Sequence, residues 1–176
     1  MVKKTQRIYI IGNSASGKTS LAKKLSKALK IKAYDLDDYY WQKKFTKKRK
    51  PEQVEKLVKK ITKKKTWIIE GVYSSCVTCS LDKADLIIWL DYPRYIITWR
   101  LLKRQIKRKE KLSDLLDFLH YAWDYYRKPT HKHSEKNESN RQKHKRIVET
   151  YPAEIVHIKS RKELEAFLSS VKRDKP

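Results

Sequence analysis

Residues 12–19 constrain this chain more than any other stretch of its sequence. They read Gly-Asn-Ser-Ala-Ser-Gly-Lys-Thr, which is the pattern G-x-x-x-x-G-K-T. An apolar run at residues 8–11 precedes the pattern, and leucines at helical spacing (Leu21, Leu25 and Leu29) follow it. The motif has a specific meaning only in the context of a strand, a loop and a helix, and this stretch provides that context. It therefore predicts a buried parallel strand, a tight glycine-containing turn and a helix N-terminus.

A loop of this kind is suited to binding a polyphosphate. Its glycines let the backbone curl around the anion without Cβ clashes, and its N–H groups and the helix N-terminus then point at the phosphates. Lys18 is expected to reach the β- and γ-phosphates of ATP, and the Thr19 hydroxyl to ligate Mg²⁺. A lysine-rich turn before an ordinary helix is the alternative, but two of the chain's three glycines lie in this loop. The residues expected to bind the nucleotide here are Gly12, Asn13, Ser14, Ala15, Ser16, Gly17, Lys18, Thr19 and Ser20.

Length and composition predict one folded domain over residues 1–176. A chain of 176 residues with 39% hydrophobic residues can bury a substantial core. No apolar run approaches the length of a membrane span, and the run after the basic N-terminus is too short for a signal peptide. We therefore expect a cytoplasmic protein without a membrane partner.

The net charge of +24 favours anionic partners such as nucleotides, nucleic acids, phospholipid surfaces or acidic proteins. Lysines on the outer face of an expected helix, such as Lys23, Lys24 and Lys27, are also typical of a solvated surface. The sequence contains no zinc finger and no aromatic pair of the kind that reads RNA. Weak, non-specific binding of nucleic acid is the expectation.

Cys76 and Cys79 are the only cysteines and have C-x-x-C spacing. A zinc site would need two further ligands, which His131 and His133 could supply only if the fold brought them close. A redox-active dithiol is a second alternative. Two reduced thiols near the start of a helix are the favoured interpretation.

Strands and helices alternate along the chain. Strands are expected at residues 8–11, 31–34, 67–71, 85–91 and 155–158, and helices after the loop, from Pro51, from Pro93, after Ser113, at residues 141–150 and after Ser160. Polar stretches at residues 42–50 and 128–140 are expected to be flexible loops. This alternation predicts an α/β fold with a five-stranded parallel sheet and helices on both faces. Ligands of such sheets bind beyond the carboxyl ends of the strands, which here carry Asp35, Asp37, Glu70 and Asp91.

The chain resembles the P-loop proteins related to nucleoside-monophosphate kinases. More narrowly, it resembles the adenylate-kinase-related group known as topology modulation proteins. The stretches that carry the resemblance are residues 12–19, 36–41, 67–73, 90–93 and 99–104. The resemblance implies a three-layer P-loop NTPase fold with only a short lid, near residues 105–115.

In adenylate kinases, a strand-ending aspartate and a proline precede a helix with two arginines four residues apart that act on ATP. Asp91, Pro93, Arg100 and Arg104 match this spacing. The resemblance implies that Arg100 stacks on the adenine and that Arg104 contacts a phosphate. A solvated basic helix face is the alternative for both arginines.

Three departures separate the chain from adenylate kinases. Ala15 replaces a loop glycine, Glu70 replaces the aspartate of the Asp-Gly signature, and the arginine that grips the acceptor phosphate is absent near Ser74. AMP is therefore not carried over as the acceptor. Asp35 and Asp37 instead resemble the D-x-D pair of shikimate kinase and its relatives, in which one acid serves the metal and the other the acceptor hydroxyl.

These residues predict an ATP-dependent small-molecule kinase that transfers the γ-phosphoryl group of Mg-ATP to a small acceptor, either a nucleotide or a hydroxylated metabolite. Asp35 or Glu70 would hold the waters of the metal ion, and Asp37 would orient or deprotonate the acceptor hydroxyl. Turn and capping chemistry is the alternative for the aspartates. The alternative functions are a nucleotide-regulated DNA- or RNA-binding protein and a polynucleotide kinase.

Overall fold

The computed structural model describes residues 6–43, 46–71, 78–108, 112–127 and 140–173. Its elements, in chain order, are β1 (Arg7–Gly12), α1 (Lys18–Leu29), β2 (Ala33–Asp35), α2 (Leu36–Tyr40), β3 (Trp41–Lys43), β4 (Lys47–Lys48), α3 (Pro51–Thr62), β5 (Trp67–Glu70), α4 (Thr78–Leu81), β6 (Leu86–Leu90), α5 (Arg94–Arg108), α6 (Leu112–Asp124), α7 (Arg141–Thr150), β7 (Glu154–Ile158) and α8 (Arg161–Arg173).

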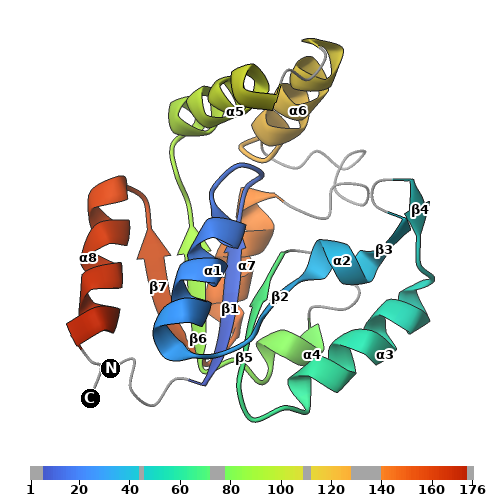
Figure 1. Cartoon of the computed structure of the whole chain (residues 1–176), viewed down its shortest axis with the longest axis vertical. Helices are drawn as coiled ribbons and strands as arrows, with labels where there is room; N and C mark the ends of the chain where they lie inside the picture. Colours follow the sequence, from blue (N-terminus) through green and yellow to red (C-terminus); the bar gives the residue numbers. More distant parts are fainter. Residues whose placement is uncertain (1–5, 44–45, 72–77, 109–111, 128–139, 174–176) are drawn as a thin grey trace.

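Five strands form one parallel sheet in the order β2-β5-β1-β6-β7. The first strand, β1, lies at the centre between β5 and β6. All the carboxyl ends therefore meet at the same edge, which faces α5 and α6 at the top of Figure 1. The five-stranded parallel sheet predicted from the sequence is confirmed.

Side chains of β1 alternate between two hydrophobic clusters, one on each face of the sheet. Ile8 and Ile10 pack with residues of α1, α5 and α8, whereas Tyr9 and Ile11 pack with residues of α3, α4 and α7. A strand that is covered on both faces needs apolar residues at successive positions, as this run has. Helices therefore cover both faces of the sheet, as the alternation of elements predicts.

The helices α5 and α6 pack against each other beyond the carboxyl ends of the strands (Figure 1). Ile97 and Leu101 of α5 and Ala122 of α6 are buried beneath them. The short lid predicted near residues 105–115 falls on the end of α5 and the start of α6. The connection between the two helices, residues 109–111, lies outside the described residues. None of the described helices is both long and apolar enough to cross a membrane.

The structure corrects the prediction of a flexible loop at residues 42–50, because β3 and β4 form an antiparallel hairpin there. The ammonium group of Lys48 lies 5.4 Å from the ring centroid of Tyr40 and 5.5 Å from that of Trp41. The guanidinium of Arg49 donates to the carbonyl oxygens of residues 38, 39 and 41. Cation–π contacts and these hydrogen bonds order a stretch that composition alone marks as a loop.

Two helices and one helix boundary also differ from the sequence expectation. The sequence did not predict α2 or α4, and α6 begins at Leu112 rather than after Ser113. Asn140, placed in the flexible loop at residues 128–140, is buried and caps α7 by accepting the backbone N–H of Lys143 at 2.8 Å. The rest of that loop, residues 128–139, lies outside the described residues.

The structure describes one of the two cysteines. Cys79 lies in α4 and packs, partly buried, against the core. Cys76 and both candidate histidine ligands, His131 and His133, fall outside the described residues. The C-x-x-C alternatives therefore stay predictions.

Candidate active site

The loop between β1 and α1 depends on glycine at two positions for different reasons. Gly12 has a φ of 152°, and a Cβ atom there would come within 2.7 Å of the Leu90 carbonyl oxygen. Gly17 has a φ of 96° at the N-cap of α1, where the left-handed backbone rather than crowding requires glycine. Ala15 has a φ of 56°, so an L-residue with a Cβ atom occupies the left-handed region here.

Lys18 folds back over the loop that precedes it. Its half-buried ammonium donates to the carbonyl oxygens of Gly12 at 3.1 Å and Asn13 at 3.0 Å. Burial lowers the pKa of Lys18, and the nearby carboxylates of Glu70, Asp37 and Asp35 act in the opposite direction. Lys18 follows β1, Glu70 ends β5, and the two aspartates lie at the end of β2 and in the helix that follows it, so groups from three strand ends act on one another electrostatically.

Glu70 lies beside the helix N-terminus that carries Thr19. The Thr19 hydroxyl donates to the Glu70 carboxylate at 2.5 Å, although 51 residues separate the two in sequence. Only 3% of Glu70 is exposed, and this burial raises its pKa, whereas Lys18 and the hydrogen bond from Thr19 lower it. A buried carboxylate is kept only where it has such partners.

Asp35, the last residue of β2, and Asp37 take part in capping as well as in the electrostatic interactions with Lys18. Asp35 is the N-cap of α2, and its carboxylate accepts the backbone N–H of Asp37 at 2.9 Å. The bond uses the backbone of Asp37 and not its carboxylate. Asp35 therefore caps α2, as the alternative interpretation predicts. The charges of both carboxylates also act to raise the pKa of Lys18.

The donors near the loop suit Mg²⁺ in chemical type. Thr19, Glu70 and Asp35 offer oxygen atoms only, which Mg²⁺ prefers. Among the described residues, no group of three or more histidine, cysteine, aspartate or glutamate side chains is arranged to enclose a metal ion. A magnesium ion of a phosphate-binding loop takes few protein ligands and completes its shell with water and phosphate oxygens, so the residues present fit that ion.

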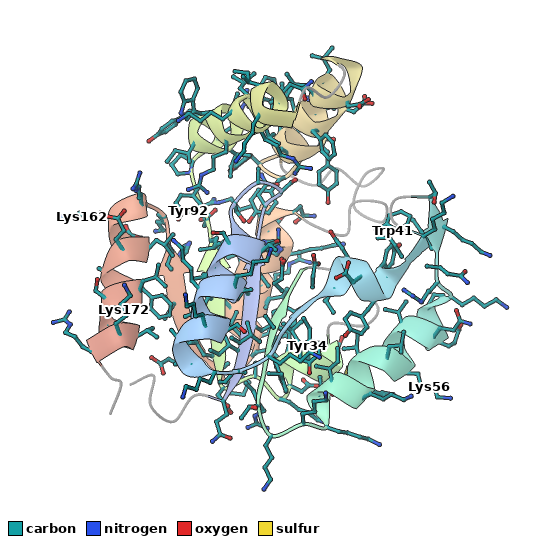
Figure 2. All side chains as sticks on the ribbon, in the orientation of Figure 1. Tyr34, Trp41, Lys56, Tyr92, Lys162 and Lys172 are labelled. Atoms are coloured by element: carbon teal, nitrogen blue, oxygen red, sulfur yellow. The ribbon has the colours of Figure 1, made fainter. Side chains whose placement is uncertain are left out.

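Arg100 reaches the loop from α5. Its guanidinium donates to the Ser16 carbonyl oxygen at 2.6 Å and lies 4.0 Å from the ring centroid of Tyr92. Tyr92, labelled in Figure 2, is buried between the sheet edge and α5. The structure thus places Arg100 at the loop, with the ring of Tyr92 against its guanidinium, and its predicted stacking on adenine stays a prediction.

Arg104 does not reach the loop in this structure. Its guanidinium lies 5.4 Å from the ring centroid of Phe118, between α5 and α6. Its Nε is buried and makes no hydrogen bond with any described residue. Although the two arginines are four residues apart on one helix, Arg100 lies at the loop and Arg104 lies between α5 and α6.

Asn13 connects the loop to α6. Its side-chain amide donates to the Ala122 carbonyl oxygen at 2.9 Å, and its side-chain oxygen accepts the backbone N–H of Ser14 at 2.7 Å. The Tyr126 hydroxyl donates to the Tyr92 carbonyl oxygen at 2.6 Å, just after α6 ends. Asn13 thus attaches α6 to the loop, as Arg100 attaches α5 to it. We call α5 and α6 the lid helices, because the lid predicted near residues 105–115 falls in them.

Two other residues that the sequence predicts to bind the nucleotide differ in exposure. Ser16 is buried, and Ser20 is exposed in the first turn of α1.

Asp91, directly after β6, is engaged by Arg141 and His157. Arg141 donates to both carboxylate oxygens of Asp91 at 2.8 Å, and His157 contacts the same group at 3.0 Å. Burial alone would raise the pKa of Asp91, but the hydrogen bonds from Arg141 and His157 outweigh it and hold the pKa below its usual value. This aspartate anchors α7 to the sheet edge.

Comparison with known proteins supports the fold but gives little direct information on function. No family model matches the chain. Over 104 residues the chain is 36% identical to the uncharacterized protein YqaC of Bacillus subtilis, and the match spans 58% of each protein. A shikimate kinase from Bacteroides thetaiotaomicron superimposes with a TM-score of 0.56 at 16% identity, covering 96% of this chain and 97% of that one. The shikimate kinase of Acinetobacter baumannii, solved with shikimate, gives 0.57 at 13% identity, covering 99% and 98%.

The fold is that of the shikimate kinases. Sequence reasoning found the loop and the acids at the strand ends, but it missed Tyr92, Tyr126 and Arg141. The sequence does contain a signal for Arg141, because it follows the helix cap Asn140 and opens the helix before the last strand. Tyr92 lies between the strand-ending Asp91 and a proline, a position that the parallel-sheet topology places at the same edge as the loop.

Proposed function

We propose that the chain is an ATP-dependent small-molecule kinase. The observation that carries this proposal is the convergence of Lys18, Thr19 and Glu70 at one sheet edge, beside the aspartates that follow β2. A phosphoryl-transfer site needs this combination, because charge neutralisation and positioning supply most of the catalysis. The shikimate-kinase fold supports the same reaction class.

Each residue of the loop has a role that its position allows. The backbone N–H groups of residues 12–19 would bind the β- and γ-phosphates, and Lys18 would exchange its carbonyl partners for phosphate oxygens. Thr19 would ligate Mg²⁺, and Glu70 and Asp35 would hold the waters of its shell. When bound, Mg²⁺ neutralises charge on the transferring phosphoryl group.

Asp37 is our candidate for the residue that serves the acceptor. Its backbone N–H donates to the Asp35 carboxylate at the start of α2, so the carboxylate of Asp37 is not the group that caps this helix. It would orient or deprotonate an acceptor hydroxyl. Arg100 and Arg104 would act on the nucleotide, the first from its place beside Ser16 and the second after the lid helices shift.

The acceptor is proposed by class only, as a nucleotide or a hydroxylated metabolite. The Acinetobacter structure contains shikimate, which is a hydroxylated acid, and this supports the second class. Membership of the adenylate-kinase-related topology modulation group, a single domain over residues 1–176 and a cytoplasmic location belong to the same proposal. The exposed basic hairpin (Lys43, Lys47 and Lys48) beside α2 favours a polynucleotide kinase as the second candidate.

Lys18→Ala tests the proposal directly. Mg-ATP should raise the melting temperature of the wild-type protein, and this shift and all phosphoryl transfer should be lost in the variant, because no other side chain replaces its charge at the phosphates. A screen of nucleotides and hydroxylated metabolites with Mg-ATP then seeks the acceptor. Lys24→Ala, on the exposed face of α1, is the matched control and should behave as wild type. A wild-type protein that millimolar Mg-ATP does not stabilise would refute the proposal.

A further inference from the structure

The helix α5 has two apolar faces rather than one. Ile97 and Leu101 on its inner face are buried against the body of the molecule. Tyr95, Trp99 and Ile106 lie on the opposite face and are 73%, 58% and 79% exposed, respectively. With the partly exposed Leu102 they recur at steps of four, three and four residues, which places all four on one stripe. We call these four residues the outer stripe.

An exposed apolar stripe of this kind is unusual on a protein surface that faces water. A surface helix normally turns charged and polar residues away from the core, and contiguous apolar patches mark places where something binds. Between Arg94, Thr98 and three residues of the outer stripe lies a hollow of about 500 Å³. Figure 2 shows side chains standing out from α5 on the side away from the sheet, beyond the rest of the fold.

The charged residues of α5 all have the same sign. In its 15 residues α5 contains no acidic residue, and its basic residues are Arg94, Arg100, Lys103, Arg104, Lys107 and Arg108. Lys103 and Lys107 border the stripe and are exposed, and the ammonium of Lys103 lies 4.9 Å from the ring centroid of Trp99. A partner that covers the stripe therefore meets cations along its edge, and charge complementarity requires that partner to be anionic.

Charge and chemistry narrow the choice of partner. A second copy of this chain would bring two bodies of charge +24 together. Nucleic acid could stack bases on Tyr95 and Trp99, but the aliphatic side chains of Leu102 and Ile106 offer nothing for a base to stack on. A lipid interface accepts both kinds of side chain, because tyrosine and tryptophan favour the headgroup region while leucine and isoleucine enter the acyl boundary.

We propose that the outer stripe of α5 docks on an anionic phospholipid bilayer. Tyr95, Trp99, Leu102 and Ile106 enter the interface, and Lys103 and Lys107 contact the anionic headgroups. The contact is peripheral and departs from the expectation of a chain without a membrane partner. It requires no particular chemistry at the loop between β1 and α1.

The test is co-sedimentation of the full chain with vesicles. We expect binding to mixed phosphatidylcholine and phosphatidylglycerol vesicles, with a blue shift in tryptophan emission, and little binding to phosphatidylcholine alone. Raising the salt concentration should weaken the binding. Trp99→Ser with Ile106→Ser should lower the affinity about tenfold or more, because two large apolar anchors are lost. Trp99→Phe should retain binding but lose most of the blue shift.

Two controls make the test specific to this helix. Leu116→Ser alters a residue of α6 that is equally exposed, at 59%, and should leave vesicle binding unchanged. Lys103→Glu with Lys107→Glu should weaken binding more than Lys23→Glu with Lys24→Glu, which changes the net charge equally on α1. Far-UV circular dichroism and a cooperative thermal unfolding transition report that each variant is folded. Equal vesicle binding by the serine variant and wild type, or a stripe needed for dimer formation or for DNA binding instead, would overturn the proposal.

Discussion

At the scale of single residues, the loop shows which positions the backbone itself restricts. Gly12 is required by a close approach to the Leu90 carbonyl and Gly17 by a left-handed backbone. Ala15 takes the left-handed region without glycine, at a cost of about 1 kcal/mol. This chain therefore accepts a strained backbone at a position where the adenylate-kinase loop that its sequence resembles has glycine.

Asp37→Asn should separate binding from chemistry. Because the residue would serve the acceptor and not the nucleotide, the dissociation constant for Mg-ATP should stay nearly unchanged while transfer falls by roughly 10²-fold or more. The α2 cap survives, since it uses the backbone N–H of Asp37. Isothermal titration with Mg-ATP and a phosphoryl-transfer assay measure the two effects. A variant that loses ATP binding would place Asp37 in the metal site instead.

Arg141→Ala should destabilise the protein by roughly 2 kcal/mol at neutral pH, because it leaves the buried carboxylate of Asp91 with His157 as its remaining partner among the described residues. The folded pKa of Asp91 lies below its unfolded value. The stability that it contributes is therefore fully present above the unfolded pKa of about 4 and is lost as the pH falls through the folded pKa.

Urea unfolding measured between neutral and acidic pH checks this expectation. The stability difference between wild type and Arg141→Ala should shrink as the pH falls below about 4. Arg127→Ala provides the control, because its ion pair with Asp124 is on the surface and contributes little. A difference that is independent of pH would show that Arg141 acts through packing alone.

At the scale of elements, the lid helices α5 and α6 close over the strand ends. Asn13 donates to the Ala122 carbonyl on α6, and Arg100 on α5 donates to the Ser16 carbonyl. The loop between β1 and α1 is thus connected to both helices. Under the proposed function, Arg104 would reach the nucleotide only after these helices move, because it lies between them against Phe118.

Arg104→Ala should lower kcat more than it raises KM for ATP. The Nε atom of Arg104 is buried and makes no hydrogen bond to a described residue, and the guanidinium would meet phosphate charge only when α5 and α6 shift during catalysis. Steady-state kinetics with varied ATP separates the two parameters. Arg108→Ala, on the same helix, controls for the loss of one positive charge. Wild-type kinetics for Arg104→Ala would show that this arginine serves only the packing of α5 on α6.

At the scale of the whole molecule, the charge of +24 should give weak binding to duplex DNA. Lysines are spread over several helices, and no base-reading element accompanies them in the sequence, so the contact is with phosphates alone. Fluorescence anisotropy should detect binding at low salt that is lost by about physiological salt and does not depend on sequence. Added DNA should leave ATP turnover unchanged. Tight, sequence-selective binding at physiological salt would favour the polynucleotide alternative.

The five strands of the parallel sheet, most of the helices and the glycine-containing turn between β1 and α1 followed from the sequence, because they depend on local patterns. Apolar runs and glycine spacing depend on neighbouring residues, and the motif needs only a strand before it and a helix after it. The acids at the strand ends could also be predicted, since a parallel sheet brings its carboxyl ends to one edge. The hairpin of β3 and β4 could not be predicted in this way, because composition does not reveal the contacts of Lys48 with the rings of Tyr40 and Trp41.

Only the tertiary structure decided which partners these residues meet. The Thr19–Glu70 hydrogen bond joins residues 51 positions apart, and the pairing of Arg141 with Asp91 joins residues 50 positions apart. It also separated Arg100 from Arg104, which helical spacing alone would place on one face. Contacts of this kind depend on the packing of distant elements around a shared core, and no local pattern in the sequence encodes the direction in which a side chain finally points.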